Sequence, residues 1–501
     1  MISLGIDIGG TGCKCVAFQD DGRQLAVSYR EYPNPPGKVS LEPLILRDSV
    51  FGVIAGCVAE LSDRKQVAAI TVSSFGESFV AVDAQGEPLG DIVMYFANSE
   101  SGDFDELVER VGAERFMRIA RVLPDASYSL AKFRYMLQTA PRPVWKFLPI
   151  ASYLCFCLSG ETVVDYSLAC RTLLFDVERR RWSEELLECC GVEPMTLPDA
   201  LPSGSTAGKL RPELAGQLGL GSEVRVVIGT HDQLVNALGA GVRRVGDCAD
   251  ITGTVECIEP LFAALPESLD FQRKNYACVP YFQDAGYVTY AYNISAGSVV
   301  KWYRDVLAPH LREEARARGV SVYDLLNESC PGEPTDLMVL PHLQGMGGTP
   351  DVLTGATGLF AGLTTRTTLP ELYRAVLEGL TFEMAYNLEK LAQYGILPAA
   401  LSACGGGARS APWRQIKADI LNKPIYFSLA EETGALGSAI LGFAAVTGEK
   451  DIFPLAGRFV RHGEPAEPNT ARAAVYRDKF EEYKRYRRFA VEQVKRHEEK
   501  Q

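Results

Sequence analysis

The sequence lacks any apolar run long enough to cross a membrane, and its N-terminus has no basic segment followed by an apolar stretch. We therefore predict no membrane anchor, no signal peptide and a cytoplasmic location. The 13 cysteines are an odd number without a Cys-x-x-Cys pair, which is typical of reduced, mostly buried thiols. The five histidines form no His-Glu-x-x-His pattern, so a zinc site has little support.

Positive charge is also scarce. Lys and Arg total 51 against 63 Asp and Glu, giving a formal net charge of -12. This balance disfavours nucleic acid as a partner, because phosphate contacts dominate such binding. The chain is long, with 501 residues, and 47% of its side chains are hydrophobic. A chain of this length is usually too large to fold around a single hydrophobic core. We expect two domains, 1–244 and 245–501, with a small-molecule site in the cleft between them.

Strand-like and helix-like segments alternate along the chain, which predicts an α/β fold. Residues 4–18 indicate two strands around a glycine turn, with 24–32 as a third, and apolar β-branched runs recur at 67–73 and 223–229. The segments with helical character are 41–61, 103–120, 129–138, 147–158, 370–392, 412–421, 435–445 and 471–495, and a further strand is expected at 400–404.

The first glycine turn follows a carboxylate, in Gly5-Ile6-Asp7-Ile8-Gly9-Gly10-Thr11. Its glycines let backbone N–H groups approach an anion. We expect Asp7 to hold magnesium, usually through water, and Gly10 and Thr11 to face phosphate. A Walker loop is excluded because Thr11 stands where Lys is required, and a dinucleotide fingerprint fails because a strand follows. A purely structural glycine hairpin stays open.

A second glycine and threonine turn, Thr252-Gly253-Thr254, opens the second half of the chain. We interpret it as a weak internal duplication of the first turn. Two facing hairpins, one with Gly10 and Thr11 and one with Gly253 and Thr254, would clamp a polyphosphate from both sides. An ordinary strand turn is the alternative.

Another carboxylate stands at a strand-to-helix junction, in Gly229-Thr230-His231-Asp232-Gln233. Asp232 is placed to accept a proton from a substrate hydroxyl. The alternative is a helix N-cap, for which Asp is common. We interpret His231 as structural.

A triple glycine follows the strand predicted at 400–404, in Cys404-Gly405-Gly406-Gly407, and precedes a helix that carries Trp413 and Gln415. Bare backbone lets a flat ring lie against it, which favours an adenosine platform. A flexible loop is the alternative.

Together these motifs resemble the FGGY carbohydrate kinases in order and spacing, over nearly the whole chain. The matching stretches are Gly5-Ile6-Asp7-x-Gly9, Gly229-x-x-Asp232-Gln233, Gly253-Thr254, Gly405-Gly406-Gly407-x-x-Ser410-x-x-Trp413-x-Gln415 and Gly434-Ala435-Leu436-Gly437-Ser438-Ala439. The resemblance implies two ribonuclease-H-like domains of the actin and hexokinase superfamily around a central cleft. It also implies phosphorylation of a hydroxyl of a ketose or polyol, with ATP and Mg²⁺.

The resemblance further implies a role for each half. Domain 1–244 would bind the substrate and carry the first phosphate hairpin and the catalytic base, Asp232, whereas domain 245–501 would bind ATP. Asp7 and Asp232 would be the metal ligands. The expected substrate-binding residues are Ser74, Glu77, Tyr128 and Gln233, and the expected nucleotide-binding residues are Gly10, Thr11, Gly253, Thr254, Gly405, Gly406, Gly407, Ser410 and Gln415. The expected partner is a small carbohydrate, and a homodimer stays open.

The chain departs from the family at the substrate pocket. Many relatives carry Trp-x-Asp-x-Arg where this chain reads Tyr95-Phe96-Ala97-Asn98-Ser99. One alternative is a sugar-acid kinase, which needs Arg or Lys near the substrate carboxylate, yet none occurs in 73–78 or 95–99. The other is an actin-like ATPase or sensor that phosphorylates no sugar. A pocket carboxylate at Glu77 would favour neutral substrates, and a solvated surface Glu is the alternative.

Overall fold

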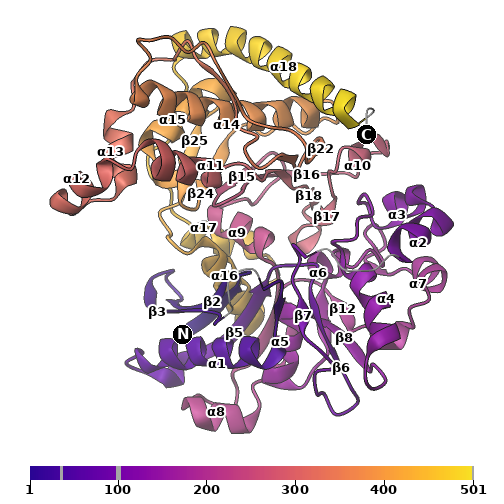
Figure 1. Ribbon diagram of the computed structural model, residues 1–501. Helices are drawn as coiled ribbons and strands as arrows, with labels where there is room; N and C mark the ends of the chain where they lie inside the picture. Colours follow the sequence, from indigo (N-terminus) through magenta and orange to yellow (C-terminus); the bar gives the residue numbers. More distant parts are fainter. Residues whose placement is uncertain (34–37, 98–102, 499–501) are drawn as a thin grey trace.

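The computed structural model describes residues 1–33, 38–97 and 103–498, and Figure 1 shows two halves, one above the other. The lower half is built on a six-stranded sheet in the order β13-β14-β5-β1-β2-β3. Its strands are β1 (Ile2–Ile8), β2 (Gly12–Gln19), β3 (Gln24–Glu31), β5 (Val67–Ser74), β13 (Thr206–Lys209) and β14 (Arg225–His231). Strands β1, β2 and β3 form the predicted antiparallel meander, and β1, β5 and β14 are parallel neighbours.

The upper half repeats this arrangement. Its sheet has the order β17-β18-β16-β15-β24-β25, with β19 paired to β16. Its strands are β15 (Cys248–Thr252), β16 (Glu256–Phe262), β17 (Val279–Pro280), β18 (Tyr287–Val288), β19 (Ala291–Asn293), β24 (Leu401–Cys404) and β25 (Ile425–Phe427). A β15–β16 hairpin followed by the parallel strand β24 corresponds to β1, β2 and β5 below. The α/β class is confirmed.

Helix α16 (Thr433–Thr447) comes late in the chain but packs on the lower sheet. Alternate residues of a strand point to the same face, and those that meet α16 are small. A Cβ on Gly5 would lie 2.0 Å from Ala435 O, and Ser73 Oγ lies 2.9 Å from Ser438 Oγ. Small side chains on both surfaces therefore permit the close contact between helix and sheet.

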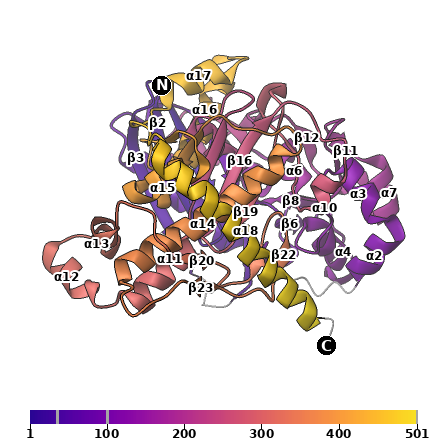
Figure 2. The same cartoon turned by 90° about the horizontal axis from the view of Figure 1, so that it is seen from above.

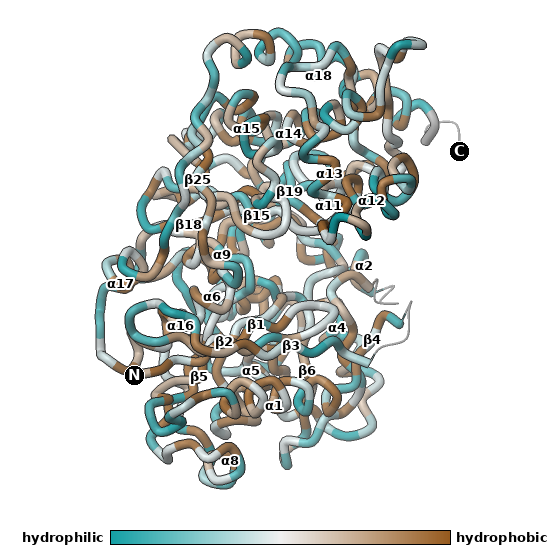
Figure 3. The backbone as a smooth tube through the Cα atoms, turned by 90° about the vertical axis from the view of Figure 1, so that its left-hand side faces the viewer, coloured by the Kyte–Doolittle hydropathy of each residue, from teal (hydrophilic) through white to brown (hydrophobic). Residues whose placement is uncertain are grey.

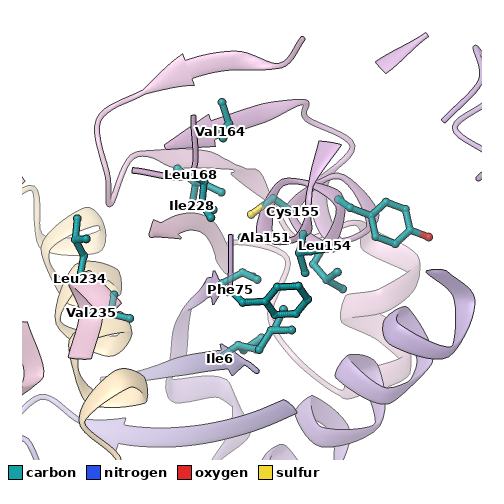
Figure 4. Close-up of a cluster of buried hydrophobic side chains, with 14 of the residues drawn as sticks. Ile6, Phe75, Ala151, Leu154, Cys155, Val164, Leu168, Ile228, Leu234 and Val235 are labelled. Atoms are coloured by element: carbon teal, nitrogen blue, oxygen red, sulfur yellow. The ribbon is translucent and has the colours of Figure 1, made fainter. Parts of the chain in front are cut away.

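The opposite face of the lower sheet is apolar. Ile6 and Ile228 lie in one buried cluster with Ala151, Leu154 and Cys155 of helix α5 (Ile150–Ser159), as Figure 4 shows. Helix α1 (Pro43–Ala59) covers β2 and β3. Burial of each large aliphatic side chain contributes about 1.5–3 kcal/mol. This apolar layer stabilises the register of β1, β5 and β14. The register in turn determines that the three strands end at the same edge of the sheet.

Helix α9 (Asp232–Ala240) lies between the two halves, in contact with β5 and β14 below and with β15 and β24 above. The chain later returns to the lower half with α16 and α17 (Ile452–Phe459), whose buried residues belong to the lower core. It then rejoins the upper sheet where Ala466 pairs with Ile425. Residues 433–459 therefore pack with the lower half although they follow most of the upper half in the sequence. The predicted domain boundary between residues 244 and 245 stays a prediction.

The upper half carries the long helices α14 (Leu369–Ala392), α15 (Ala411–Leu421) and α18 (Thr470–Glu498), close to the predicted bounds. Figure 2, seen from above, shows α18 lying across this half. Figure 3 shows hydrophobic residues along interior strands such as β2 and β5. In the part of the chain that the structure describes, no helix is both long and apolar enough to span a membrane.

Two predicted helical segments differ in detail. Segment 103–120 forms two helices, α2 (Asp103–Val111) and α3 (Ala113–Ile119), because Gly112 between them adopts φ 91°. Segment 147–158 begins as strand β8 (Lys146–Pro149), which pairs with β6 (Phe79–Val82) before α5 begins.

The remaining elements are short. The helices among them include α4 (Ser129–Thr139), α6 (Tyr166–Cys170), α7 (Glu184–Cys190), α8 (Pro212–Leu218), α10 (Asp270–Arg273), α11 (Gly297–Trp302), α12 (Leu311–Arg318) and α13 (Val322–Ser329). Short strands include β4 (Ser40–Leu41), β7 (Ile92–Val93), β9 (Val163–Asp165), β10 (Phe175–Asp176), β11 (Arg181–Trp182), β12 (Asp199–Leu201), β20 (Met338–Leu340), β21 (Met346–Gly347), β22 (Val352–Leu353) and β23 (Leu359–Ala361).

Candidate active site

The register of the lower sheet brings three of the predicted residues to one edge. Ile8 on β1 and His231 on β14 both pair with Ser74 on β5. Asp7, Ser74 and Asp232 therefore stand at the carboxyl ends of three neighbouring parallel strands. This is the edge at which open α/β sheets bind their ligands.

Asp232 begins α9 but does not cap it. The N-cap position is His231, and no side-chain cap bond forms there, so the capping alternative is wrong. Burial, followed by the fields of Asp7 and Glu77, raises the pKa of Asp232 to about 7. Burial also raises the pKa of Asp7 to about 6. Carboxyl groups with such pKa values suit proton transfer near neutral pH.

Asn236, one turn after Asp232, connects the backbone of Asp232 to α16. Its Nδ2 donates to Asp232 O at 3.0 Å, and Thr433 Oγ1 donates to its Oδ1 at 2.8 Å. The next residue of α16, Gly434, leaves room for the other carboxylate, since a Cβ there would lie 2.9 Å from Asp7 Oδ2. The start of α16 therefore lies against both carboxylate-bearing segments.

The tips of the two predicted phosphate hairpins are exposed. Thr11 lies between β1 and β2, and Gly253 and Thr254 lie between β15 and β16. Gly10 packs against the ring of Tyr95, whose Cε1 lies 3.2 Å from the position of an added Cβ. Backbone groups at both tips are open to a ligand, as an anion site requires. Asn98 and Ser99 of the altered pocket segment lie outside the described residues.

The three glycines after β24 differ in what surrounds them. Gly405 has φ 82° and would place a Cβ 2.6 Å from Thr252 O, whereas Gly407 would place one 2.4 Å from Thr252 Cγ2. The turn needs both glycines to pack on β15. Gly406 is exposed, and its Cβ position has open space around it. Gly406 is therefore the position where bare backbone is available to a flat ring.

Ser410 and Gln415 both make hydrogen bonds within the local structure. Ser410 Oγ accepts from Trp413 N at 3.3 Å and donates to Asn327 Oδ1 at 2.8 Å. Gln415 Nε2 donates to Asp419 Oδ1 at 2.8 Å. These bonds hold the start of α15 behind the glycine turn, and a direct nucleotide contact by either residue stays a prediction.

Glu77 is an enclosed and paired carboxylate, so the solvated-surface alternative is wrong. Its side chain is 11% exposed, and Arg171 Nε donates to its Oε1 at 2.5 Å. The guanidinium carbon of Arg171 lies 4.7 Å from the ring centre of Tyr128. Burial opposes ionisation of Glu77, but the field of Arg171 and its hydrogen bond outweigh burial and lower the pKa of Glu77. Lys132 Nζ donates to Glu77 O at 2.9 Å, where the backbone has φ 60°.

Sequence reasoning missed Arg171. It lies 94 residues after Glu77, outside the segments in which a basic pocket residue was sought. No motif connects the two positions, and only the packing of α6 beside β14 brings them together.

Gln233 and Ser74 differ in whether their side chains are free to make hydrogen bonds to a ligand. Gln233 Oε1 is buried without a hydrogen-bond partner among the described residues, so it can accept a bond from a ligand. Ser74 Oγ donates to Phe75 O at 2.9 Å and accepts from Ala151 N at 3.1 Å. The hydroxyl of Ser74 thus serves the fold, and its contact with substrate stays a prediction.

Tyr290 of the upper half reaches the same site. Its Oη lies 3.3 Å from His231 Nδ1, and the guanidinium carbon of Arg171 lies 5.6 Å from its ring centre. His231 Nδ1 in turn lies 3.4 Å from Asp232 Oδ1. Burial lowers the pKa of His231 to about 3, so the imidazole is neutral at physiological pH. A side chain from the upper half therefore contacts His231 and Arg171, the residues next to the carboxylates of this edge.

Asp7 and Asp232 are the predicted metal ligands. Within 1–33, 38–97 and 103–498, no cluster of three or more His, Cys, Asp or Glu side chains is arranged to enclose a metal ion. Magnesium that arrives with a nucleotide needs only one or two carboxylates, with phosphate oxygens and water as its other ligands. The two carboxylates fit this donor set, because a divalent cation would offset the burial that raises their pKa values.

Comparison with known proteins matches residues 2–239 to the N-terminal domain, and residues 253–446 to the C-terminal domain, of the FGGY family of carbohydrate kinases. A gluconokinase from Bacillus licheniformis is 27% identical over 491 residues, covering 95% of this chain and 93% of the relative. A xylulose kinase from Lactococcus lactis is 26% identical over 498 residues, covering 96% of this chain and 95% of the relative.

A solved structure agrees with the fold. The ligand-bound xylulose kinase from Lactobacillus acidophilus has a TM-score of 0.86 and 24% identity, and the match covers 98% of both chains. The likeness at this identity concerns the two-domain architecture alone. Because the two domain models together cover most of the sequence, the chain belongs to the FGGY family of carbohydrate kinases.

Proposed function

We propose that this chain transfers the γ-phosphoryl group of ATP to a hydroxyl of a small carbohydrate, with Asp232 as the general base. The observation that supports this most directly is the placement of Asp232 beside Asp7 at the carboxyl edge of the lower sheet, with a pKa raised to about 7. A base whose pKa lies near the working pH accepts a hydroxyl proton efficiently.

The nucleotide would contact turns of both halves. Its phosphates would lie on Gly10 and Thr11 and on Gly253 and Thr254, whose exposed tips support this placement. The adenosine ring would lie on the open backbone of Gly406. Asp7 would hold Mg²⁺, which neutralises charge on the phosphates when bound, and the carboxylate of Asp232 would stay available for the substrate proton. Positioning and charge stabilisation supply most of the rate enhancement in such transfers.

The proton of the attacking hydroxyl would pass to the carboxylate of Asp232 as the new oxygen–phosphorus bond forms. Neutral His231 and the amide of Asn236 adjoin Asp232. His231 lies against the carboxylate of the base, whereas Asn236 holds its backbone carbonyl. Neither competes for the proton, because burial lowers the pKa of His231 to about 3 and an amide is not basic near neutral pH.

The substrate would be held by Glu77, Arg171 and Gln233. Arg171 contacts Glu77 Oε1 through both its Nε and a terminal guanidinium nitrogen, which leaves Oε2 for a substrate hydroxyl. Gln233 Oε1 is a second acceptor among the described residues. Two acceptors and a guanidinium donor suit a chain of hydroxyls, which supports a neutral ketose or polyol.

A second candidate is a sugar acid, and Arg171 is the observation that favours it. Its charge offsets that of Glu77, so the expected repulsion of a substrate carboxylate is much reduced. Guanidinium groups are also good partners for carboxylates. The gluconokinase among the relatives has the same implication.

A coupled assay of ADP release distinguishes these candidates. Ketoses, polyols and sugar acids of equal chain length are compared at saturating ATP and Mg²⁺. We expect the best neutral substrate to exceed the matched sugar acid in kcat/KM by at least tenfold. A sugar acid as the best substrate would favour the second candidate. ATP hydrolysis that no carbohydrate changes would contradict sugar phosphorylation altogether.

A further inference from the structure

A buried lysine lies beneath the second phosphate hairpin. Lys417, on α15, is 3% exposed, and its Nζ lies 2.5 Å from Asp250 Oδ2 and 2.6 Å from Glu256 Oε1. It also donates to Thr252 Oγ1 at 2.9 Å. Asp250 and Thr252 are on β15 and Glu256 is on β16. One ammonium group therefore holds both strands of the hairpin on either side of its exposed tip, Gly253–Val255.

The same lysine connects the hairpin to the glycine turn. Gly405 and Gly407 pack on Thr252, and Lys417 donates to the hydroxyl of that threonine. Trp413, one turn before Lys417, also contacts Gly407, with its Cζ3 3.0 Å from the position of an added Cβ. The ring centre of Trp413 lies 4.9 Å from Lys417 Nζ. Lys417 is thus at the junction of two segments proposed to hold the nucleotide.

The surrounding charges require a cation at this position. Asp250 is 1% exposed and Glu256 is fully buried, and a buried carboxylate without a paired cation is costly. Burial raises the pKa of Glu256, and the field of Lys417 acts in the opposite direction. Lys417 is the cation that offsets the buried carboxyl groups of Asp250 and Glu256.

We propose that Lys417 is a positioning residue of the nucleotide site, which fixes the Gly253–Thr254 tip relative to the Gly405–Gly407 turn. Lys417 acts through these two segments and does not itself contact ATP. The inference rests on the proposed nucleotide site. It predicts an effect on ATP affinity that is separate from carbohydrate binding, because Glu77 and Gln233 belong to the lower half.

The test is ATP binding to Lys417→Met, measured by calorimetry without carbohydrate, together with the two KM values. We expect ATP affinity to fall by about ten- to hundredfold, as the loss of hydrogen bonds to a charged group implies. The KM for the carbohydrate should change by less than about twofold. Lys479→Met is the matched control, because Lys479 Nζ also makes a buried pair, at 2.7 Å from Glu378 Oε2, in the same half. It should lower Tm and leave ATP affinity unchanged.

A compensated variant covers the case in which Lys417→Met fails to fold. Lys417→Met combined with Asp250→Asn and Glu256→Gln removes the buried charges together with the bridge. It should fold and recover most of the lost Tm, yet bind ATP at least about fivefold more weakly than the unmodified chain.

Two results would overturn the proposal, and they are distinguishable. ATP affinity equal to that of the unmodified chain, in either Lys417 variant, would remove the role of Lys417 and leave the proposed function intact. Absence of ATP binding by the unmodified chain would overturn the nucleotide site itself, and the proposed function with it.

Discussion

Tyr290 Oη lies 3.3 Å from His231 Nδ1, so a tyrosine of the upper half contacts the residue immediately before Asp232. Removing this hydroxyl in Tyr290→Phe should lower kcat/KM for the carbohydrate about two- to tenfold, because one hydrogen bond contributes about 0.5–1.5 kcal/mol. The KM for ATP should stay the same. Tyr287→Phe is the control, since Tyr287 packs on Phe262 of the upper sheet. Equal kcat/KM values for both variants and the unmodified chain would remove Tyr290 from the site.

Glu77 and Arg171 should separate neutral from acidic substrates. Glu77→Ala removes an acceptor from the pocket, and we expect kcat/KM for the best neutral substrate to fall by about 1–3 kcal/mol in transition-state free energy. ATP affinity should barely change. The unpaired Arg171 should also raise the relative activity with sugar acids. Glu77→Ala/Arg171→Ala is the control and should lose that gain. An unaltered kcat/KM in Glu77→Ala would show that the pocket lies elsewhere.

Activity should depend on the ionisation of Asp232. Its pKa is raised to about 7, and the base works only when it is deprotonated, so kcat/KM should fall as pH falls through about 7. Folding stability should depend on pH in the opposite direction. Because Asp232 binds its proton more tightly in the folded state than in the unfolded state, the free energy of unfolding should decrease as pH rises from about 4 to 7. Asp232→Asn should therefore raise Tm at pH 8. A kcat/KM that stays flat between pH 5 and 8 would contradict this assignment.

The two halves should draw together on ligand binding. The proposed phosphate turns lie on different sheets, and the chain links these sheets near 241–247, near 428–433 and at 460–466. We expect ATP with carbohydrate to reduce the radius of gyration in small-angle scattering, and either ligand alone to do so less. Identical scattering profiles with and without both ligands would count against closure around these segments.

Much of the arrangement could be predicted from the sequence because local signals were strong. The Asp7 turn, the meander and the α14 and α15 segments follow from glycine spacing and periodicity, and the structure has them close to the expected bounds. The packing of α16 on the lower sheet could not be predicted, since it depends on small residues such as Gly5 and Ser438 meeting across the fold.

The candidate site shows the same limit. Asp232 and Gln233 stand in a recognisable motif, but Arg171, Tyr290 and Lys417 lie far from their partners in sequence and carry no motif. The repulsion of sugar acids was expected from Glu77 considered alone. Its pairing with Arg171 weakens that expectation, because the guanidinium offsets the negative charge of Glu77. The pairing could not be predicted, since the two residues are far apart in the sequence and no motif connects them.

The central claim is that Asp232 takes the proton of the substrate hydroxyl. Single-turnover transfer of the γ-phosphoryl group by Asp232→Asn, with ATP binding measured in parallel by calorimetry, tests it most directly. Asp478→Asn, an exposed position on α18, is the control. We predict that phosphoryl transfer falls by about 10²- to 10⁴-fold while ATP affinity stays within about threefold, because an amide cannot accept the proton. Transfer by Asp232→Asn at a rate near that of the unmodified enzyme would contradict the account.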